Sequence, residues 1–300
     1  MIDKLVQLQA LDLETKVMKT KMRIKEWVRE FGENGVYVAF SGGKDSTVLL
    51  HIVRELYPDV PAVFVNTGLE YPEVVEFARS VDNLVELKPK MNFKDVITKY
   101  GYPVVSKEQS QFIQQYRTAK SEKTKNTRWN GNDKGQFKIS EKWKPLCKAD
   151  FKISEKCCDI MKKNPSKNYE KESGKKAIIG TMAAESRFRK MEWNKYSCNA
   201  FENKRPTSRP ISFWLEKDIW EYIRKYNVPY SKIYDVEGIE RTGCMYCGFG
   251  LHMQKEPNKF QLMQTTHPKI HKYCVENLGL GKIVDFMNEN CKCNINLYKE

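Results

Sequence analysis

Six residues near the start of the chain have the types and the order needed to hold a phosphate group. Ser41-Gly42-Gly43-Lys44-Asp45-Ser46 follows the apolar run 36–40 and opens a stretch with apolar residues at helical spacing. Glycines let backbone amides approach an anion closely, and a helix N-terminus adds partial positive charge. Lys44 offers a point charge to phosphoryl oxygens, and Asp45 offers Mg²⁺ a carboxylate. The segment predicts a nucleotide phosphate site, although it is not the G-x-x-x-x-G-K-S/T pattern.

Four of the nine cysteines stand in two close pairs. Cys157 and Cys158 are adjacent, and Cys244 and Cys247 form a C-x-x-C pair about 85 residues further on. Four thiolates suit zinc or an iron–sulfur cluster. Zinc sites usually separate their paired ligands by two to four residues, whereas a cubane accepts adjacent cysteines because each sulfur binds a different iron. We therefore expect a 4Fe–4S cluster, with zinc or unliganded buried thiols as the alternatives.

Further candidates lie near the end of an expected strand, at the start of an expected helix, or in a third cysteine pair. For nucleotide binding these are Asn66, Gly68, Lys107, Arg187 and Arg189, and for nucleophilic catalysis Cys291 and Cys293. Arginine forks match phosphate or sulfate oxygens, although a solvated basic turn explains the same arginines. A thiolate can attack a substrate sulfur, which makes the C-x-C pair a candidate nucleophile.

The elements that must position these residues alternate between strand and helix. We expect strands at 36–40, 61–66, 84–88 and 177–181, and helices at 45–56, 72–81, 93–100 and 106–120. Residues 209–223 read as a turn that leads into an amphipathic helix. This alternation predicts an α/β fold with a doubly wound, mostly parallel sheet, which binds ligands at the carboxyl ends of its strands.

The chain changes character along its length. We expect an N-terminal helical segment at 1–33, a nucleotide-binding domain at 34–237 and a cysteine-containing region at 238–300 that completes the cluster site. A basic insertion at about 117–175 carries 17 Lys or Arg against eight acids. We expect loop structure at 124–135, where Trp129 is a candidate for stacking on a base.

Composition narrows the classes of protein. The 300 residues carry a formal charge of +14, which indicates an anionic partner, although lysine-rich chains also serve solubility alone. No run of eighteen apolar residues exists, and the N-terminus lacks a basic-then-apolar signal pattern, so we expect a cytoplasmic protein without a membrane partner. In a reducing compartment, clustered cysteines point to metal binding or catalysis rather than to disulfides.

The six-residue loop resembles the SGGxDS pyrophosphate loop of the PP-loop ATP pyrophosphatases, whose members cleave ATP between its α- and β-phosphates. Together with Cys-Cys and C-x-x-C, it looks like the adenylyl-sulfate reductase branch of the PAPS reductase family. The segments 180–189, 210–223 and 234–244 are similar to further motifs of that family, and the match runs from about 36 to 249. The resemblance implies an adenine nucleotide alpha hydrolase-like fold, an adenine nucleotide ligand, and a 4Fe–4S cluster on Cys157, Cys158, Cys244 and Cys247.

Departures from the family pattern bear on the activity. The reductases usually alter the SGGxDS loop, which this chain keeps whole, and they carry a Cys-Gly-Leu-His segment where Phe249 precedes Gly250 here. Met182 or Ala183 stands where an arginine is expected. These differences favour ATP-dependent adenylylation, which yields AMP and pyrophosphate, coupled to sulfur transfer.

Two alternatives stay open. The first is a reductase of adenylyl sulfate or phosphoadenylyl sulfate that forms sulfite through a cysteine thiosulfonate, which a thioredoxin-like protein resolves. The second is a non-catalytic module that binds a nucleotide or, through the basic insertion, a nucleic acid. The corresponding partners are an adenine nucleotide, a nucleic acid, and a thioredoxin-like or sulfur-donor protein.

Overall fold

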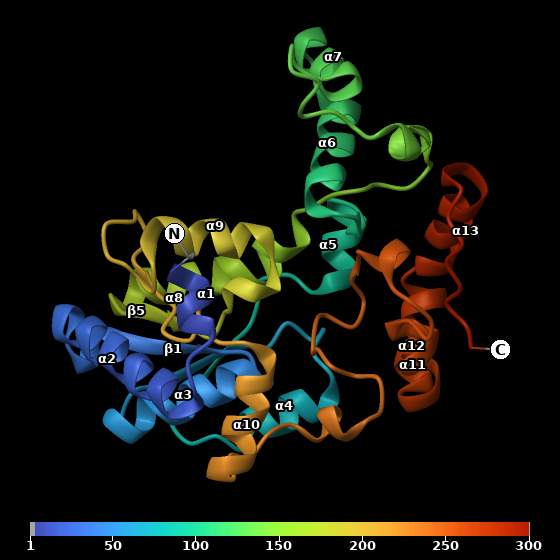
Figure 1. Cartoon of the computed structure of the whole chain (residues 1–300). Helices are drawn as coiled ribbons and strands as arrows, with labels where there is room; N and C mark the ends of the chain where they lie inside the picture. The colour runs from blue at the N-terminus through green and yellow to red at the C-terminus, as the bar shows by residue number, and fades with distance from the viewer. Residues whose placement is uncertain (1–3, 300) are drawn as a thin grey trace. The chain divides into compact units, whose positions relative to one another are not determined.

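The four expected strands lie in one six-stranded sheet. The computed structural model describes residues 4–299 (Figure 1), and the sheet has the order β3-β2-β1-β5-β7-β6. The strands are β1 (Val36–Phe40), β2 (Ala62–Val65), β3 (Leu84–Leu87), β5 (Lys176–Ile179), β6 (Asn199–Ala200) and β7 (Thr207–Ser208). The four pairings from β3 to β7 are parallel, and β6 runs antiparallel to β7. The predicted α/β fold with a doubly wound, mostly parallel sheet is confirmed.

Helices follow most of these strands. Those that flank or connect the sheet are α1 (Lys4–Gln9), α2 (Leu13–Phe31), α3 (Lys44–Leu56), α4 (Pro72–Arg79), α8 (Asn164–Ser173), α9 (Arg187–Tyr196) and α10 (Glu216–Tyr226). Helices α2, α3 and α10 pack against one another around the buried side chains of Trp27, Trp214 and Tyr222. The central strand β1 is buried at Val36, Tyr37 and Val38, which explains its unbroken apolar sequence.

A smaller two-stranded parallel sheet joins β4 (Val104–Val105) to β8 (Gly248–Phe249). The helices around it are α5 (Phe93–Lys99), α6 (Lys107–Thr118), α7 (Glu122–Asn130), α11 (Lys259–Thr266), α12 (Pro268–Lys272) and α13 (Leu280–Cys291). Among the described residues, no helix is both long enough and apolar enough to cross a lipid bilayer.

The chain forms two compact units whose segments alternate along the sequence. The first consists of the chain up to Asn66, Tyr71–Lys88 and Pro165–Asp235, and it contains the six-stranded sheet. The second consists of Thr67–Glu70, Pro89–Asn164 and the chain from Val236 onward, and it contains all four paired cysteines. This division differs from the expected sequence-order boundaries at 33/34 and 237/238, because the second unit takes most of the basic insertion as well as the C-terminal region.

The expectation of loop structure at 124–135 was wrong for its first half. Helix α7 covers Glu122–Asn130, capped by the Ser121 side chain, which accepts from the Thr124 backbone NH. The sequence hid this helix because it buries none of its residues, so no apolar periodicity marks it.

Candidate functional site

The loop at 41–46 depends on Gly42 for its shape. This residue has φ of +71°, and a Cβ added to it would lie 2.7 Å from Val74 Cγ1 and 3.0 Å from the Val74 carbonyl oxygen. Any larger residue would therefore meet both backbone strain and a clash with α4. The glycine expected from phosphate-loop chemistry is also required by packing.

Two serine hydroxyls close the loop on itself. Ser46 Oγ accepts from the Ser41 backbone NH at 3.1 Å, lies 3.0 Å from Ser41 Oγ, and donates to the Gly43 carbonyl at 2.9 Å. Ser41 Oγ in turn accepts from the Gly43 NH at 3.3 Å. The loop is thus pre-shaped at the N-terminus of α3, where helix amides attract anions.

Lys44 lies in a small cage that the sequence did not reveal. Its side chain is 4% exposed, and its Nζ is 3.0 Å from Glu216 Oε1 and above the rings of Tyr234 and Trp220, at 5.2 and 5.9 Å from their centroids. The Lys44 backbone NH also donates to the Tyr234 hydroxyl at 3.1 Å. The i, i+4 spacing of Glu216 and Trp220 places both on one face of α10, which was the available signal. The ammonium group therefore already has a counter-charge and two aromatic faces.

The loop sits where the strand order of the sheet reverses. Strands β1 and β5 are neighbours, with Ala39 opposite Ile179. Gly180, directly after β5, is close to the first turn of α3: an added Cβ would lie 3.0 Å from the Asp45 carbonyl oxygen. Ligands of doubly wound folds bind at such a switch point. Asp45, partly exposed in that first turn, is placed there as expected.

The other candidates on the first unit have partners of their own. Arg189 forms an ion pair with Glu185, one turn away, whereas Arg187 is exposed. Asn66 donates to Glu86 at 2.9 Å, and the Arg79 guanidinium together with this amide lowers the pKa of Glu86 to about 2. Asn66 thus stands at the end of β2 as predicted.

The four paired cysteines interact within the second unit. Burial raises the pKa of the Cys157 thiol, and the neighbouring thiols of Cys158, Cys244 and Cys247 raise it further. Because such electrostatic effects fall with distance, the two pairs lie in one neighbourhood although they are far apart in sequence. Within residues 4–299, no group of three or more His, Cys, Asp or Glu side chains is arranged to hold a metal ion.

Two lysines and a short loop surround these thiols, and none of them was predicted. Lys162 Nζ is 3.4 Å from Glu70 Oε1. Burial lowers the pKa of Lys162, but the nearby Cys244 and Glu70 side chains outweigh burial, so that its pKa is raised. Lys259 donates to the Cys244 carbonyl at 3.3 Å and to that of Cys247. The C-x-x-C turn is fixed from another side by Leu69, whose carbonyl accepts from the Met245 NH at 2.8 Å.

The remaining candidates of the second unit lie in separate places. Gly68 has φ of +73° in the turn from Thr67 to Glu70, where Glu70 accepts from the Thr67 NH at 2.9 Å. Lys107 is the exposed first residue of α6. Cys291 is buried at the end of α13, and burial raises its pKa to about 11, while burial also raises the pKa of the half-buried Cys293.

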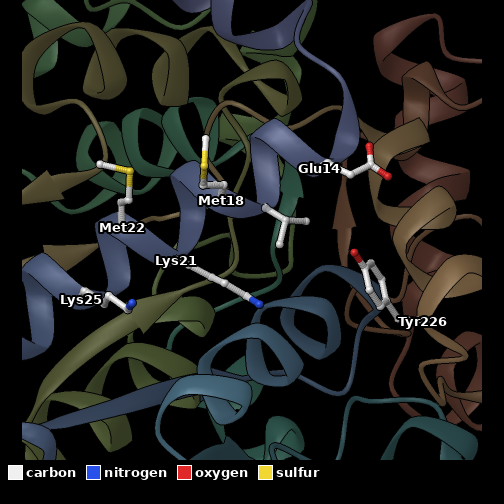
Figure 2. Close-up of a pocket in the computed structure, with 7 residues that line it drawn as sticks. Glu14, Met18, Lys21, Met22, Lys25 and Tyr226 are labelled. Carbon is white, nitrogen blue, oxygen red and sulfur yellow. The ribbon is translucent and has the colours of Figure 1, made fainter.

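A hollow of about 310 Å³ lies on α2 beside the end of α10 (Figure 2). Its lining residues are Glu14, Val17, Met18, Lys21, Met22, Lys25 and Tyr226. None of them belongs to a motif with chemistry, so this hollow is not part of the candidate site.

Comparison with known proteins decides the family. Residues 35–248 match the phosphoadenosine phosphosulfate reductase domain. The chain belongs to this family. The resemblance noted in the sequence is thereby confirmed, as is the prediction of an enzyme at the level of the family. Which reaction a member performs depends on its own site.

Of three proteins similar to this chain, one has no stated function and two are named as reductases. An uncharacterized protein of Methanocaldococcus jannaschii is 25% identical over 71% of this chain, which spans only 36% of that protein. An adenosine 5'-phosphosulfate reductase of Bacillus cereus is 22% identical over 76% of this chain and 80% of its own length. A crystal structure of phosphoadenylyl-sulfate reductase from Candida auris aligns with 75% of this chain and 88% of its own chain. The sequence identity is 17% and the TM-score is 0.45.

Proposed function

We propose that this chain binds ATP at the loop 41–46 and transfers its adenylyl group to an acceptor, releasing pyrophosphate. The observation that carries the proposal is the complete six-residue loop, closed by its own hydroxyls and packed against Val74 at the point where the strand order reverses. The shape of the loop is thus set before a nucleotide binds, and the amides of Ser41, Gly43 and Lys44, which now donate within the protein, would exchange these acceptors for phosphate oxygens.

The adenylyl transfer balances as a single displacement. An acceptor oxygen attacks the α-phosphorus, the bond from that phosphorus to the bridging oxygen breaks, and pyrophosphate leaves with the electron pair. The amides at the start of α3 and the hydroxyls of Ser41 and Ser46 would bind the departing phosphates, and Asp45 would hold a Mg²⁺ ion that neutralises part of their charge. Glu216 would orient Lys44 toward the same charge, since it lies 3.0 Å from the ammonium group.

The cysteine site supports a coupled sulfur transfer. A single zinc ion usually takes paired ligands that are separated by two to four residues, whereas Cys157 and Cys158 are adjacent. A cubane distributes four thiolates over four irons, and the Cys157–Cys158 and Cys244–Cys247 pairs fit that donor set. With a thiolate on every iron, a bound 4Fe–4S cluster would supply redox and electrostatic chemistry rather than an open iron site. Lys162 and Lys259 would offset the negative charge of the thiolates.

In the second half of the reaction, hydrosulfide from a sulfur donor would attack the activated acceptor carbon. A carbon–sulfur bond forms, the carbon–oxygen bond breaks, and AMP leaves with that oxygen. The donor is a separate reactant that the cell must supply.

A sulfonucleotide reductase is the second candidate, since the Bacillus cereus relative carries that name. Its nucleophile would be Cys291 or Cys293. With a pKa of about 11, the Cys291 thiol is ionised to roughly one part in ten thousand at pH 7, which suits a nucleophile poorly. Phe249, where a family cysteine is expected, is paired in β8. These observations favour the adenylylating function.

Product analysis tests this choice. Cluster-loaded protein with ATP, Mg²⁺ and candidate acceptors should release AMP and pyrophosphate, and Asp45→Asn should slow this release roughly 100-fold, as expected for a lost charge-stabilising group. Asp82→Asn, at an exposed position, is the matched control and should leave the rate unchanged. Release of ADP and phosphate alone would contradict the proposal. A sulfite-sized adduct on Cys291 or Cys293 after addition of adenylyl sulfate would establish the reductase instead.

The cluster has its own test. Protein purified without oxygen should be brown and carry about four irons per chain. Cys244→Ala should remove the colour, whereas Cys198→Ala, a buried cysteine of the first unit, should keep it. Colourless protein with about one zinc per chain would reject the cluster and leave the phosphate-loop proposal intact.

A further inference from the structure

The hairpin of α6 and α7 concentrates positive charge. Residues 117–144 contain nine Lys or Arg and three Asp or Glu, so that they carry a net charge of +6 out of the +14 of the whole chain. Helix α7 packs against α6 but buries none of its own residues (Figure 1). Since a helix that is polar on every side gains little from a hydrophobic face, its value to the protein lies in the side chains that it displays.

Arg128 fixes the geometry of this hairpin. Its guanidinium donates to Gln115 Oε1 at 2.7 Å and to the Phe137 carbonyl at 2.8 Å, and it lies 4.4 Å from the centroid of the Phe112 ring. The Arg128 carbonyl accepts from the Ile139 NH at 2.7 Å. The segment after α7 is therefore held in one place against α6 and α7.

A tight loop then presents an exposed aromatic ring. Asn132 Oδ1 accepts from the backbone NH groups of Lys134 at 3.1 Å and Gln136 at 2.8 Å. The next residue, Phe137, has φ of +62° and is 53% exposed. A bulky residue in the left-handed region is strained, and an exposed phenyl ring gains nothing from burial. A ligand that stacks on the Phe137 ring would compensate for both the backbone strain and the exposure of the ring.

Trp129, which the sequence suggested for stacking on a base, already contacts other side chains of the protein. Trp129 stacks on Tyr116 at 4.9 Å with an interplanar angle of 28°, and Lys144 Nζ lies 4.5 Å from the Trp129 ring centroid. Phe137 is instead the ring that this surface offers to a ligand.

Most lysines of residues 117–144 have no carboxylate partner. Lys125 and Lys144 pair with Glu122 and Glu141. Within the described part of the chain, no ion pair engages the five other lysines of this segment, which are Lys120, Lys123, Lys134, Lys138 and Lys142.

A wide hollow of about 580 Å³ lies beside Lys120. It is lined by Gln115, Thr118, Ala119, Lys120, Ser121, Thr124 and Arg128. Hydroxyl, amide and cationic groups together bind phosphodiester oxygens.

We propose that the α6–α7 hairpin and the 132–138 loop bind single-stranded nucleic acid. The unpaired lysines would contact successive phosphates, and Phe137 would stack on a base, the combination that single-strand binding surfaces use. An acidic protein partner would match the charge, but it gives no reason for an exposed, strained phenyl ring. This surface is independent of the proposed ATP chemistry.

Fluorescence anisotropy of the full chain tests the proposal. The probe is a labelled single strand of about 16 nucleotides, the upper site size for one small binding fold, offered as RNA, as DNA and as a duplex. Affinity should fall steeply from about 50 to 200 mM salt, and Lys123→Glu with Lys134→Glu should flatten the logarithmic salt slope by roughly 0.7 per lost phosphate contact. Phe137→Ala should weaken binding roughly 5- to 150-fold, whereas Phe137→Trp should retain it.

The control has the same change in charge at another surface. Lys25→Glu with Lys171→Glu alters two exposed lysines of the first unit and should leave binding within about twofold, because these lysines are not part of the proposed surface and salt screens long-range effects. Equal losses in both double variants would reject a defined surface. An unchanged affinity of Phe137→Ala would reject stacking, and tighter binding of duplex than of single strand would reject the proposed ligand class. Thermal unfolding of each variant verifies that it is folded.

Discussion

Gly42→Ala should destabilise the protein more than the same substitution at a glycine with a similar backbone angle and no neighbours. At Gly42, with φ of +71°, an added Cβ would lie 2.7 Å from Val74 Cγ1 and 3.0 Å from the Val74 carbonyl oxygen. Gly174 has φ of +73°, and an added Cβ there would find no atom within 4 Å. Both glycines belong to the first unit. The two variants therefore share the backbone penalty and differ in the steric contact.

The expected magnitudes separate the two variants. The left-handed conformation costs a residue with a Cβ about 1–2 kcal/mol, and a less flexible unfolded chain returns about 0.4–1 kcal/mol. Gly174→Ala should therefore lower the free energy of unfolding by about 1 kcal/mol. Overpacking adds about 1–3 kcal/mol at Gly42, because the Val74 carbonyl cannot retreat without moving the first turn of α4. Against a typical total of about 5–15 kcal/mol, the difference is large.

Urea unfolding followed by circular dichroism measures both variants, and pyrophosphate release is measured under conditions where both are folded. Gly42→Ala should also lose most of its activity with ATP, whereas Gly174→Ala should keep it. Adding Val74→Ala to Gly42→Ala should restore part of the stability, since it removes the side-chain contact but leaves the carbonyl. Equal losses in the two glycine variants would refute the reasoning that α4 forms a rigid wall behind the loop.

Three further predictions concern charges and a thiol. Because Arg79 and Asn66 hold the pKa of Glu86 at about 2 rather than its ordinary 4.5, its stabilising contribution is present above pH 4.5 and lost as the pH falls toward 2. Acid unfolding of Glu86→Gln should therefore lack this part of the pH dependence, and an unchanged profile would contradict the assignment. Lys16 lies fully buried 2.6 Å from Asp218, so Lys16→Met should lower the free energy of unfolding by about 3–5 kcal/mol. Urea titration measures this loss, and one below about 1 kcal/mol would show that the pair is replaceable. Alkylation of Cys291, followed by mass spectrometry, should accelerate about tenfold per pH unit until its pKa of about 11; a plateau near pH 7 would reveal an activated thiolate.

Local patterns predicted the elements that carry the phosphate loop. The apolar run 36–40 is β1 with the same bounds, and the helical spacing after it is α3, which begins at Lys44. These predictions succeeded because strand, glycine turn and helix cap are short-range effects within a few residues. The two cysteine pairs 157/158 and 244/247 are also recognisable in the sequence, and their joint role as ligands of one cluster stays a prediction.

The surroundings of Lys44 were beyond the reach of such patterns. Glu216, Trp220 and Tyr234 lie more than 170 residues away along the chain. The packing of α10 against α3 brings the first two to the lysine, and Tyr234 comes from the short helix Lys232–Asp235. Helix α7 escaped for the opposite reason: it depends on a cap and on α6 rather than on an apolar face. Phe137 went unnoticed because its exposure follows from a loop fixed by Asn132, which leaves no periodic trace in the sequence.

The interleaving of the two compact units limits how this protein can be divided. The chain passes from one unit to the other after Asn66, Glu70, Lys88, Asn164 and Asp235. No single truncation therefore yields one unit complete without residues of the other, and a protease cut between 89 and 164 leaves each fragment with part of both units. Likewise, no exchange of one continuous segment of the gene transfers a whole unit without pieces of the other. The sheet that holds the phosphate loop and the region that holds the four thiols are therefore bound to be inherited together.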